Sequence, residues 1–465
     1  MTQAREAAKT VTILGCGYVG LTTAAILAEA GYKVYAVEPN PERLRIIQSG
    51  RSFFFEVGLD ALVAAGISSG QLVATDSYDS VEHSSVVFSC VGTPDKPDGS
   101  SNLQYVYDAA KQSAARMPAG AIYVQKSTVP VGTGEQLIEQ HFTKDRSIAY
   151  VSNPEFLSES TAVADTLWPA RVVTGSRDEA AARQILDVYR DIEKAASAVA
   201  TRASIDKPQR ALTTEYISTS LDSAELIKVS SNAFLALKIS FANSMAKLAD
   251  ATGADITEVM HAVGTDPRIG TAFLNAGRGY GGGCFPKDVS GLIRSAAEYG
   301  VSLPIMKAAS DTNDSMADYC VQKIMTALQT ADDSTNNHAG SRVAMLGLAF
   351  KAGTSDTRRS PAIAIVRLLV ANGVQVAAFD PVAMREAEPE LPDAVIRVSS
   401  LEDAIRDVDC ICLATDWPEF LDNLPTLLAD MPPASRPHAI IDCMNKLSPD
   451  TLPQDMRYDG IGKRR

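Results

Sequence analysis

Residues 11–38 read VTILGCGYVGLTTAAILAEAGYKVYAVE, and this stretch decides the fold of the first part of the chain. Residues 11–14 predict a short buried strand, residues 21–30 a helix that Gly31 ends, and residues 33–38 a second strand. The turn between the first strand and the helix carries three glycines, at 15, 17 and 20. This βαβ pattern is typical of a dinucleotide-binding sheet.

Each glycine of the turn has a separate physical role. Gly15 permits a tight turn, Gly17 lets a pyrophosphate approach the backbone, and Gly20 lets the helix pack on the strand. Glu38 ends the second strand, where its carboxylate can accept hydrogen bonds from ribose hydroxyls and repel a 2′-phosphate. We therefore expect NAD rather than NADP. The alternative is a glycine-rich turn that only packs a Rossmann-like sheet.

The rest of the chain predicts two α/β domains and a long helix between them. Strand-like runs at 85–91, 121–126 and 148–151 extend the first sheet, and helical periodicity runs from Leu221 to Ala262. That helix either joins the domains and carries subunit contacts or is buried within one domain. After the hydrophilic stretch 330–340, a strand at 342–347, a helix at 361–372 and a strand at 374–379 predict a second βαβ unit. Its first turn, GLAFK at 347–351, lacks the three-glycine pattern, so we expect no dinucleotide there in the same manner.

Bulk properties exclude several classes of protein. With 465 residues the chain exceeds what one core serves, and its 46% hydrophobic and 21% charged residues are typical of globular domains. The net charge of -13, without a basic run, argues against nucleic acid. Seven scattered cysteines and five distant histidines predict reduced thiols and no metal site. The polar segment 1–10 is no signal peptide and no apolar run spans a bilayer, so we expect a cytoplasmic protein without a membrane partner.

A second motif, GRGYGGGCFPKD at residues 277–288, carries the chemistry. Five glycines within seven residues leave backbone amides free to approach a ligand, and Cys284 follows them directly. A cation at Lys287 can stabilise a thiolate that attacks an electrophilic carbon, with Asp288 beside it. The alternative is an ordinary buried cysteine. The setting favours a covalent nucleophile.

These motifs together resemble the UDP-glucose/GDP-mannose dehydrogenase family, and within it most closely the UDP-glucose 6-dehydrogenases. The resemblance spans nearly the whole chain. It rests on residues 15–21 (GCGYVGL), 91–94 (VGTP), 127–133 (STVPVGT), 153–157 (NPEFL), 232–236 (NAFLA), 277–288 and 346–351 (LGLAFK), with Arg358, Ser360 and Pro361.

The resemblance implies an α/β fold of two Rossmann-like, doubly wound parallel-sheet domains joined by a long central helix. It assigns residues 1–205 to NAD binding and residues 206–325 to a central helical part that links, dimerises and contributes to catalysis. Residues 326–465 would form a C-terminal α/β domain that binds the nucleotide sugar. A homodimer or higher homo-oligomer is implied, and polysaccharide or glycan precursor supply is the implied pathway.

The implied reaction removes two hydrides from the sugar C6, as in the oxidation of UDP-glucose to UDP-glucuronate, and consumes two NAD. Cys284 would add to the aldehyde as a thiohemiacetal, pass through a thioester and release the acid to water. Lys228 and Asn232, on one helix face, would stabilise the oxyanions. Thr128, Glu159 and Asp288 match residues that position water or move protons, and which of them is the base stays open.

Binding residues carry over from the same motifs. Arg268 matches an arginine that the family contributes across a subunit boundary, which implies a dimer; a surface salt bridge is the alternative. The implied cofactor contacts are Gly15, Gly17, Val19, Gly20, Glu38, Arg43, Thr93, Thr128, Glu159, Lys287 and Arg358. The implied substrate contacts are Glu155, Phe156, Leu157, Glu159, Lys228, Asn232, Arg268, Phe273, Leu274, Asn275, Gly277, Gly281 and Lys351.

Two departures from the family pattern leave the sugar open. Residues 52–59 read SFFFEVGL and lack both prolines of the usual loop, which predicts a less rigid segment. Residues 442–445 read DCMN and lack an arginine expected beside the substrate. GDP-mannose or another UDP-sugar is therefore an alternative substrate. More distant hypotheses are a two-electron hydroxyacid dehydrogenase, which needs no cysteine, and a catalytically silent NAD-binding protein, which would lack the nucleophile and its helpers.

Overall fold

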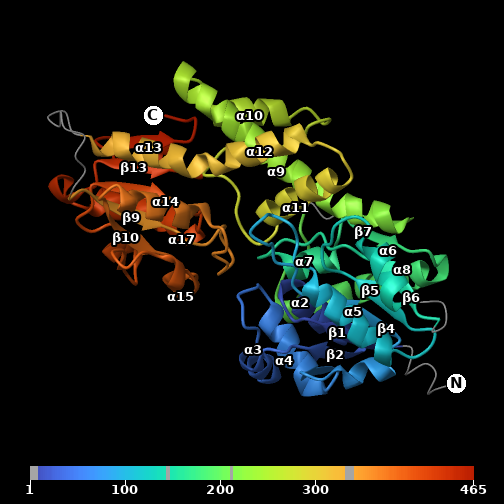
Figure 1. The fold of residues 1–465 in the computed structure, drawn as a ribbon. Coiled ribbons are helices and arrows are strands. Elements are labelled where there is room, and N and C mark those ends of the chain that lie inside the picture. The colour runs from blue at the N-terminus through green and yellow to red at the C-terminus, as the bar shows by residue number, and fades with distance from the viewer. Residues whose placement is uncertain (1–8, 143–146, 210–212, 330–339, 465) are drawn as a thin grey trace. The chain divides into compact units, whose positions relative to one another are not determined.

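The computed structural model describes residues 9–142, 147–209, 213–329 and 340–464, in two compact units (Figure 1). The first unit comprises Met1–Ser231 with Ala297–Tyr299, and the second comprises Asn232–Ala296 with Gly300–Arg465. Residues 1–8, where we expected no signal peptide, and most of the expected hydrophilic stretch at 330–340 lie outside the described residues.

The first unit contains an eight-stranded sheet of order β3-β2-β1-β4-β5-β6-β7-β8. Its first six strands follow the Rossmann order 3-2-1-4-5-6 and are parallel. β7 pairs antiparallel with β6 and parallel with β8, so the sheet continues beyond residue 205. The strands are β1 (Thr10–Leu14), β2 (Lys33–Val37), β3 (Leu72–Thr75), β4 (Val86–Ser89), β5 (Ile122–Gln125), β6 (Ala149–Ser152), β7 (Arg171–Gly175) and β8 (Glu215–Thr219).

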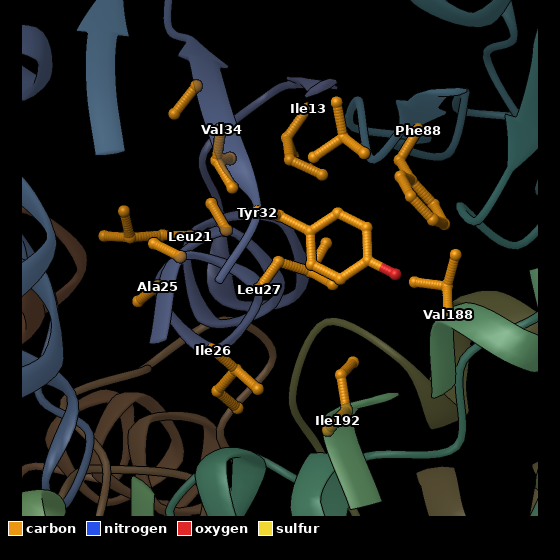
Figure 2. Close-up of a cluster of buried hydrophobic side chains, with 14 of the residues drawn as sticks. Ile13, Leu21, Ala25, Ile26, Leu27, Tyr32, Val34, Phe88, Val188 and Ile192 are labelled. Carbon is orange, nitrogen blue, oxygen red and sulfur yellow. The ribbon is translucent and has the colours of Figure 1, made fainter. Parts of the chain in front are cut away.

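Helices cover both faces of this sheet. Figure 2 shows one core, in which Ile13 of β1 and Phe88 of β4 pack with Leu27 of α2 and Ile192 of α8. The opposite face buries Tyr123 and other strand residues under α5 and α6. The helices of this unit are α2 (Tyr18–Glu29), α3 (Pro41–Gln48), α4 (Leu59–Ser69), η1 (Tyr78–His83), α5 (Gln104–Arg116), α6 (Thr133–His141), α7 (Ala162–Leu167) and α8 (Glu179–Ala203).

The predicted helix from Leu221 to Ala262 is two helices. α9 (Leu221–Thr252) begins in the first unit and continues into the second, and α10 (Ile256–Gly264) follows it. Gly253 has φ of +81°, a left-handed conformation that ends a helix at little cost for glycine. The apolar periodicity of the sequence therefore continues across the boundary between two helices.

The second unit repeats the Rossmann order in a six-stranded parallel sheet, β11-β10-β9-β12-β13-β14. Separate cores lie on its two faces, one under α13 and α14 and the other under α16 and α17. The strands are β9 (Arg342–Leu346), β10 (Gln375–Phe379), β11 (Ile396–Arg397), β12 (Cys410–Leu413), β13 (Ala439–Asp442) and β14 (Arg457–Gly460). The helices are α11 (Phe285–Glu298), α12 (Pro304–Asp314), α13 (Met316–Leu328), α14 (Pro361–Ala371), α15 (Met384–Ala387), η3 (Glu388–Glu390), α16 (Leu401–Ala404), α17 (Pro418–Asp430), η4 (Pro433–Ser435) and η5 (Pro449–Thr451).

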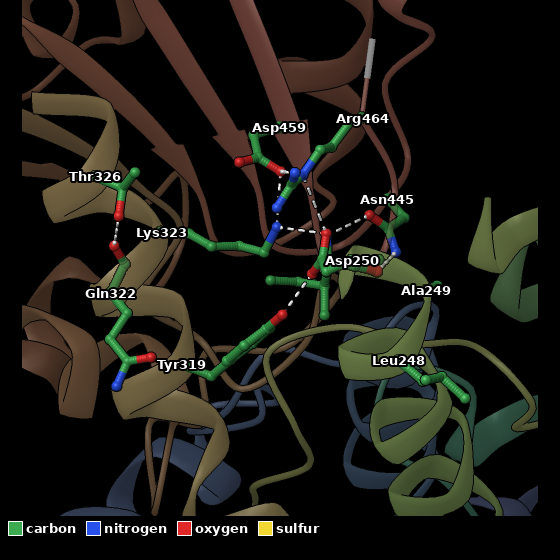
Figure 3. Close-up of polar contacts among 12 residues, drawn as sticks. Leu248, Ala249, Asp250, Tyr319, Gln322, Lys323, Thr326, Asn445, Asp459 and Arg464 are labelled. Atoms are coloured by element: carbon green, nitrogen blue, oxygen red, sulfur yellow. Dashed lines mark hydrogen bonds and ion pairs between the residues drawn. The ribbon is translucent and has the colours of Figure 1, made fainter. Parts of the chain in front are cut away.

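A buried polar network holds the end of α9 against this second sheet (Figure 3). Lys323 of α13 donates to Asp250 of α9 at 2.9 Å and to Asp459 of β14 at 2.7 Å. Tyr319 donates to the other oxygen of Asp250 at 2.5 Å. Arg464 Nε also lies 3.5 Å from an oxygen of Asp250 and 3.9 Å from one of Asp459, so the two buried carboxylates are compensated by more than one cation and the helix end is fixed.

Candidate active site

The glycine turn of the first unit fits a dinucleotide. A Cβ on Gly20 would stand 1.8 Å from the Gly15 carbonyl oxygen, so α2 can approach the turn only with glycine there. A Cβ on Gly17, by contrast, would meet nothing within 4 Å. Gly17 is the N-cap of α2 and has no capping side chain, so the first amides of the helix face an open space suited to a pyrophosphate.

Glu38 follows β2 directly, at a position from which a carboxylate can accept hydrogen bonds from ribose hydroxyls. Its side chain is buried, and its two oxygens accept hydrogen bonds from the backbone N–H groups of Asn40 at 3.0 Å and Cys16 at 3.3 Å. These bonds orient the carboxylate between the glycine turn and α3, which carries the predicted contact Arg43. Val19 lies in the first turn of α2. The residues present therefore fit NAD.

Replacing Glu38 by glutamine is expected to weaken NAD binding about tenfold, because a hydrogen bond to a charged acceptor is lost. The same change should reduce the preference for NAD over NADP, since the repulsion of a 2′-phosphate disappears. Calorimetric titration with both cofactors measures this. Glu42→Gln, an exposed neighbour on α3, is the control; equal affinities for wild type and Glu38→Gln would exclude the assigned role.

Thr93 and Thr128, the other predicted cofactor contacts of this unit, follow the carboxyl ends of β4 and β5. The loop after Thr128 is held by Glu225 of α9, a residue that the sequence did not indicate. Its carboxylate accepts from Gly132 N at 2.7 Å and Gly134 N at 2.8 Å. Burial raises the pKa of Glu225 to about 7, against the opposing effect of these amides.

The predicted substrate segment 155–159 follows β6 and is fixed by a buried lysine that sequence reasoning missed. Lys126, only 2% exposed, forms an ion pair with Glu155 and donates to the Tyr189 hydroxyl at 2.6 Å. Tyr189 donates in turn to Asn153 at 2.6 Å. The sequence predicts Lys126 as the last residue of the strand at 121–126, but no neighbouring residue indicates that Glu155 is its partner.

The electrostatics of this cluster keep Glu155 ionised. Burial alone would raise the pKa of Glu155, but the Lys126 ammonium and the Phe156 amide hold it below its ordinary value. Burial likewise opposes the charge of Lys126, while Glu155 raises the lysine pKa. The Phe156 ring lies 4.0 Å from the Arg171 guanidinium carbon and 5.4 Å from the Lys228 Nζ atom. The structure therefore brings Glu155, Phe156 and Lys228 together. Of the other predicted substrate contacts in this segment, Leu157 is half-buried and Glu159 is buried.

In the second unit, Cys284 lies immediately before α11. The Cys284 residue is exposed, and its carbonyl accepts the Asp288 N–H at 2.8 Å, so this residue stands at the N-terminus of the helix. Backbone N–H groups at such a terminus favour a negative charge, which suits a thiolate nucleophile.

Close packing explains the glycines before the cysteine. A Cβ on Gly281 would stand 2.4 Å from the Arg359 carbonyl oxygen, and one on Gly283 would stand 2.7 Å from the guanidinium carbon of Arg358. Gly282 has φ of +81° and donates its N–H to the Arg358 carbonyl at 2.9 Å. The predicted cofactor contact Arg358 is therefore placed directly against the nucleophile loop.

Asn232 and Asp288, which the resemblance implied for catalysis, form one hydrogen-bonded cluster with Lys287, an implied cofactor contact. One Asp288 oxygen accepts from the Asn232 amide at 2.6 Å, and the other accepts from the Lys287 ammonium at 2.7 Å. Asp288 is 4% and Asn232 is 6% exposed. Lys228 stands four residues before Asn232 in α9. Asp288 is thereby fixed one helical turn from Cys284.

The remaining predicted substrate residues either precede the Cys284 loop in the sequence or belong to the C-terminal domain. Leu274 is buried, whereas Phe273 and Asn275 are exposed and Phe273 has φ of +61°. Gly277 donates to the Asn243 side chain at 2.8 Å. Lys351 is half-buried after β9. Arg268 pairs with Asp266 and keeps 87% of its side chain exposed.

A second buried cation, Arg278, was also missed by the sequence analysis. It is 2% exposed, and its Nη2 atom donates to the carbonyls of Ala349 and Phe350 and to the Thr415 hydroxyl at 2.9–3.2 Å. Its backbone N–H donates to the Cys443 carbonyl at 2.9 Å. Arg278 therefore ties the nucleophile loop to the turns that follow β9, β12 and β13.

The second Rossmann-like turn does not present free amides. Asp380, at the end of β10, accepts with one oxygen from Leu348 N at 2.7 Å and Ala349 N at 3.0 Å. The turn amides that would face a pyrophosphate are therefore occupied by the protein's own carboxylate. That this turn does not hold a dinucleotide in the manner expected of the first turn stays a prediction.

No group of three or more His, Cys, Asp or Glu side chains suited to a metal ion occurs among the described residues. Within the same part of the chain, no helix combines the length and apolarity that crossing a membrane requires.

Fold and site together define an NAD-dependent dehydrogenase that has a second Rossmann-like domain and an exposed cysteine beside a charged cluster. Three family models match consecutive parts of the chain. They are the NAD binding domain at residues 9–193, the central domain at 222–315 and the UDP binding domain at 344–449 of one family. The chain belongs to the UDP-glucose/GDP-mannose dehydrogenase family.

Relatives cover almost the full chain. UDP-glucose 6-dehydrogenase of Rhizobium meliloti is 36% identical over 464 residues, 97% of this chain and 99% of the relative. UDP-glucose 6-dehydrogenase YwqF of Bacillus subtilis is 35% identical, over 88% of each chain. The solved UDP-glucose dehydrogenase of Pyrobaculum islandicum superposes with a TM-score of 0.84 at 33% identity and 98% coverage of both chains. These findings confirm the predicted family, fold and cofactor.

Proposed function

We propose that the protein oxidises the C6 alcohol of UDP-glucose to a carboxylate, giving UDP-glucuronate, with Cys284 as covalent nucleophile. The observation that carries this is the cluster of Asn232, Lys287 and Asp288 fixed one turn from an exposed Cys284. The UDP binding domain and the relatives named for UDP-glucose support the choice of nucleotide and sugar.

The residues divide the work by their chemistry. Two NAD molecules, bound in turn, would each accept one of the two hydrides that leave C6. Cys284 adds to the aldehyde that the first hydride transfer leaves. The resulting thiohemiacetal would lose the second hydride to become a thioester, which water hydrolyses to the acid and the free thiol. Lys228 and Asn232, four residues apart on α9, stabilise the oxyanions, because fixed donors act most strongly on charge that develops in the reaction. Thr128, Glu159 and Asp288 remain the candidates for handling the protons.

Sugar specificity is tested by comparing kcat/KM for UDP-glucose, GDP-mannose and UDP-N-acetylated sugars. We expect UDP-glucose to exceed the others by at least about 100-fold, because unpaired buried polar groups penalise the wrong substrate. A preference for GDP-mannose would replace UDP-glucose in this proposal while leaving the cysteine mechanism intact. The absence of the arginine at residues 442–445 makes this comparison informative.

We further propose a homodimer formed through α9. Phe234, Phe241 and Leu248 recur every seven residues on this helix and are 61%, 46% and 57% exposed. Such a stripe of large apolar side chains marks an interaction surface. Lys238, between the two phenylalanines, donates to the carbonyls of Ile269 and Gly270 at 3.2 and 3.1 Å. The loop of Arg268 is thus held next to the stripe, which would place this arginine at the boundary between copies.

The double substitution Phe234→Glu and Phe241→Glu is expected to convert the dimer to a monomer, because two charges would be buried in an apolar contact. Sedimentation velocity at micromolar concentration measures the mass. Ile305→Glu, at an apolar residue of α12 that is 62% exposed, should leave the mass unchanged. A wild-type chain that sediments as a monomer would refute the proposed dimer.

We also propose that the protein acts in the cytoplasm, with its thiols reduced. All seven cysteines are free, and five of them are buried.

A further inference from the structure

Three aromatic rings and a guanidinium form a continuous series of contacts beside the glycine turn. The rings of Tyr18 and Phe54 have centroids 4.0 Å apart, and Phe53 meets Phe54 edge-on at 5.0 Å. The Arg43 guanidinium carbon lies 4.8 Å from the centroid of the Phe53 ring. Phe53 and Phe54 belong to residues 52–58, named here the aromatic loop, which is the segment without the two prolines of the family pattern.

Both ends of this series of contacts lie at positions expected to bind the cofactor. Tyr18 stands between Gly17 and Gly20 as the first residue of α2. Arg43 lies in the first turn of α3, where Asn40 caps the helix and donates its own N–H to Glu38. The aromatic loop therefore contacts the turn that would receive the pyrophosphate and the helix beside the ribose acid.

The aromatic loop is anchored independently of its rings. Glu56, 7% exposed, accepts from Ser160 N at 2.8 Å and Ala162 N at 2.9 Å, directly after Glu159. A Cβ on Gly58, which has φ of +78°, would stand 2.6 Å from the Ala203 carbonyl oxygen. Phe53 and Phe54 also pack against the core of the first unit. The loop is thus a fixed support from which the rings reach the cofactor site.

We propose that Phe53 and Phe54 are positioning residues for NAD, which hold Arg43 and Tyr18 in their binding arrangement before the cofactor arrives. An unrestrained arginine side chain loses rotamer freedom when it binds a ligand. A cation–π contact with Phe53 restrains the side chain beforehand, so less is lost when NAD binds. In this proposal, contacts among the rings restrain the segment that the missing prolines predicted to be less rigid.

The test compares two neighbouring phenylalanines in the full chain. Phe54→Ala is expected to raise the Kd of NADH about tenfold, measured by calorimetry. Phe55→Ala should change it less than twofold, because Phe55 is 44% exposed. The Kd of UDP should stay unchanged in both variants. Equal NADH affinities in the two variants would overturn the proposal.

Two further measurements separate positioning from loss of folding. Phe54→Leu keeps an apolar side chain, so its thermal unfolding should match wild type while NADH binding stays weakened; full recovery of NADH affinity would refute a role for the aromatic ring. In a double-mutant cycle, Phe53→Ala and Arg43→Ala should be non-additive, since Phe53 acts through Arg43. Additive effects would contradict this coupling. None of these results depends on which sugar is the substrate.

Discussion

Replacing Cys284 by serine is expected to lower the rate of acid formation by roughly 10³-fold or more, the scale of loss that follows removal of a covalent nucleophile. A serine hydroxyl is un-ionised at neutral pH and adds poorly to an aldehyde, so the thioester route is closed. Because Cys284 is exposed, the change should not affect folding. Initial rates with UDP-glucose and NAD, together with circular dichroism, measure both effects.

Cys410→Ala is the matched control for this variant. Cys410 is fully buried in β12 and lies outside the predicted site, so its loss should reduce stability and leave kcat near that of wild type. If Cys284→Ser retained more than about a tenth of the wild-type rate, the covalent mechanism would be wrong.

Lys126→Met is expected to destabilise the protein by about 3–5 kcal/mol, the usual cost of breaking a buried ion pair and leaving one charge uncompensated. Lys126 is 2% exposed, and Glu155 would lose its ammonium partner. Urea unfolding measures the change. Lys194→Met removes an exposed ion pair with Asp191 and should alter stability by less than about 0.5 kcal/mol.

The pH dependence of Lys126→Met has a definite sign. In wild type, Lys126 holds the pKa of Glu155 below its ordinary value, so this pair stabilises the fold above about pH 4.3 and the contribution is lost as the pH falls further. In the variant, Lys126 no longer lowers the pKa of Glu155, and burial is expected to raise it. Protonation of Glu155 then removes the uncompensated buried charge and stabilises the variant. The stability gap between wild type and variant should therefore narrow as the pH falls from 7 to 4. A difference in stability that stays constant from pH 7 to pH 4 would show that the ionisation of Glu155 does not cause the destabilisation.

Much of the fold could be predicted because its signals are local. The strands and helix at 11–38 and the repeat at 342–379 appear where the sequence placed them, since strand length, glycine turns and buried runs are properties of adjacent residues. The sequence predicts one helix from Leu221 to Ala262, because the apolar periodicity continues past Gly253. The helical conformation of the backbone ends at Gly253, so the structure has two helices.

Residues of the candidate site could be predicted where they belong to one sequence motif. They could not be predicted where their role depends on contacts with residues distant in the sequence. Cys284, Lys287 and Asp288 are adjacent in sequence, and the family resemblance added Asn232. Lys126 contacts Tyr189, 63 residues away, and Arg278 contacts Ala349, 71 residues away. No local pattern distinguishes such a buried cation from an exposed one.

The most direct test of the central claim is the number of NADH molecules formed per UDP-glucose consumed by the purified full chain. The covalent four-electron mechanism predicts two NADH for each sugar, with UDP-glucuronate as the product and nearly complete loss in Cys284→Ser. One NADH per sugar, or turnover that does not depend on Cys284, would contradict it and indicate a simple two-electron dehydrogenase.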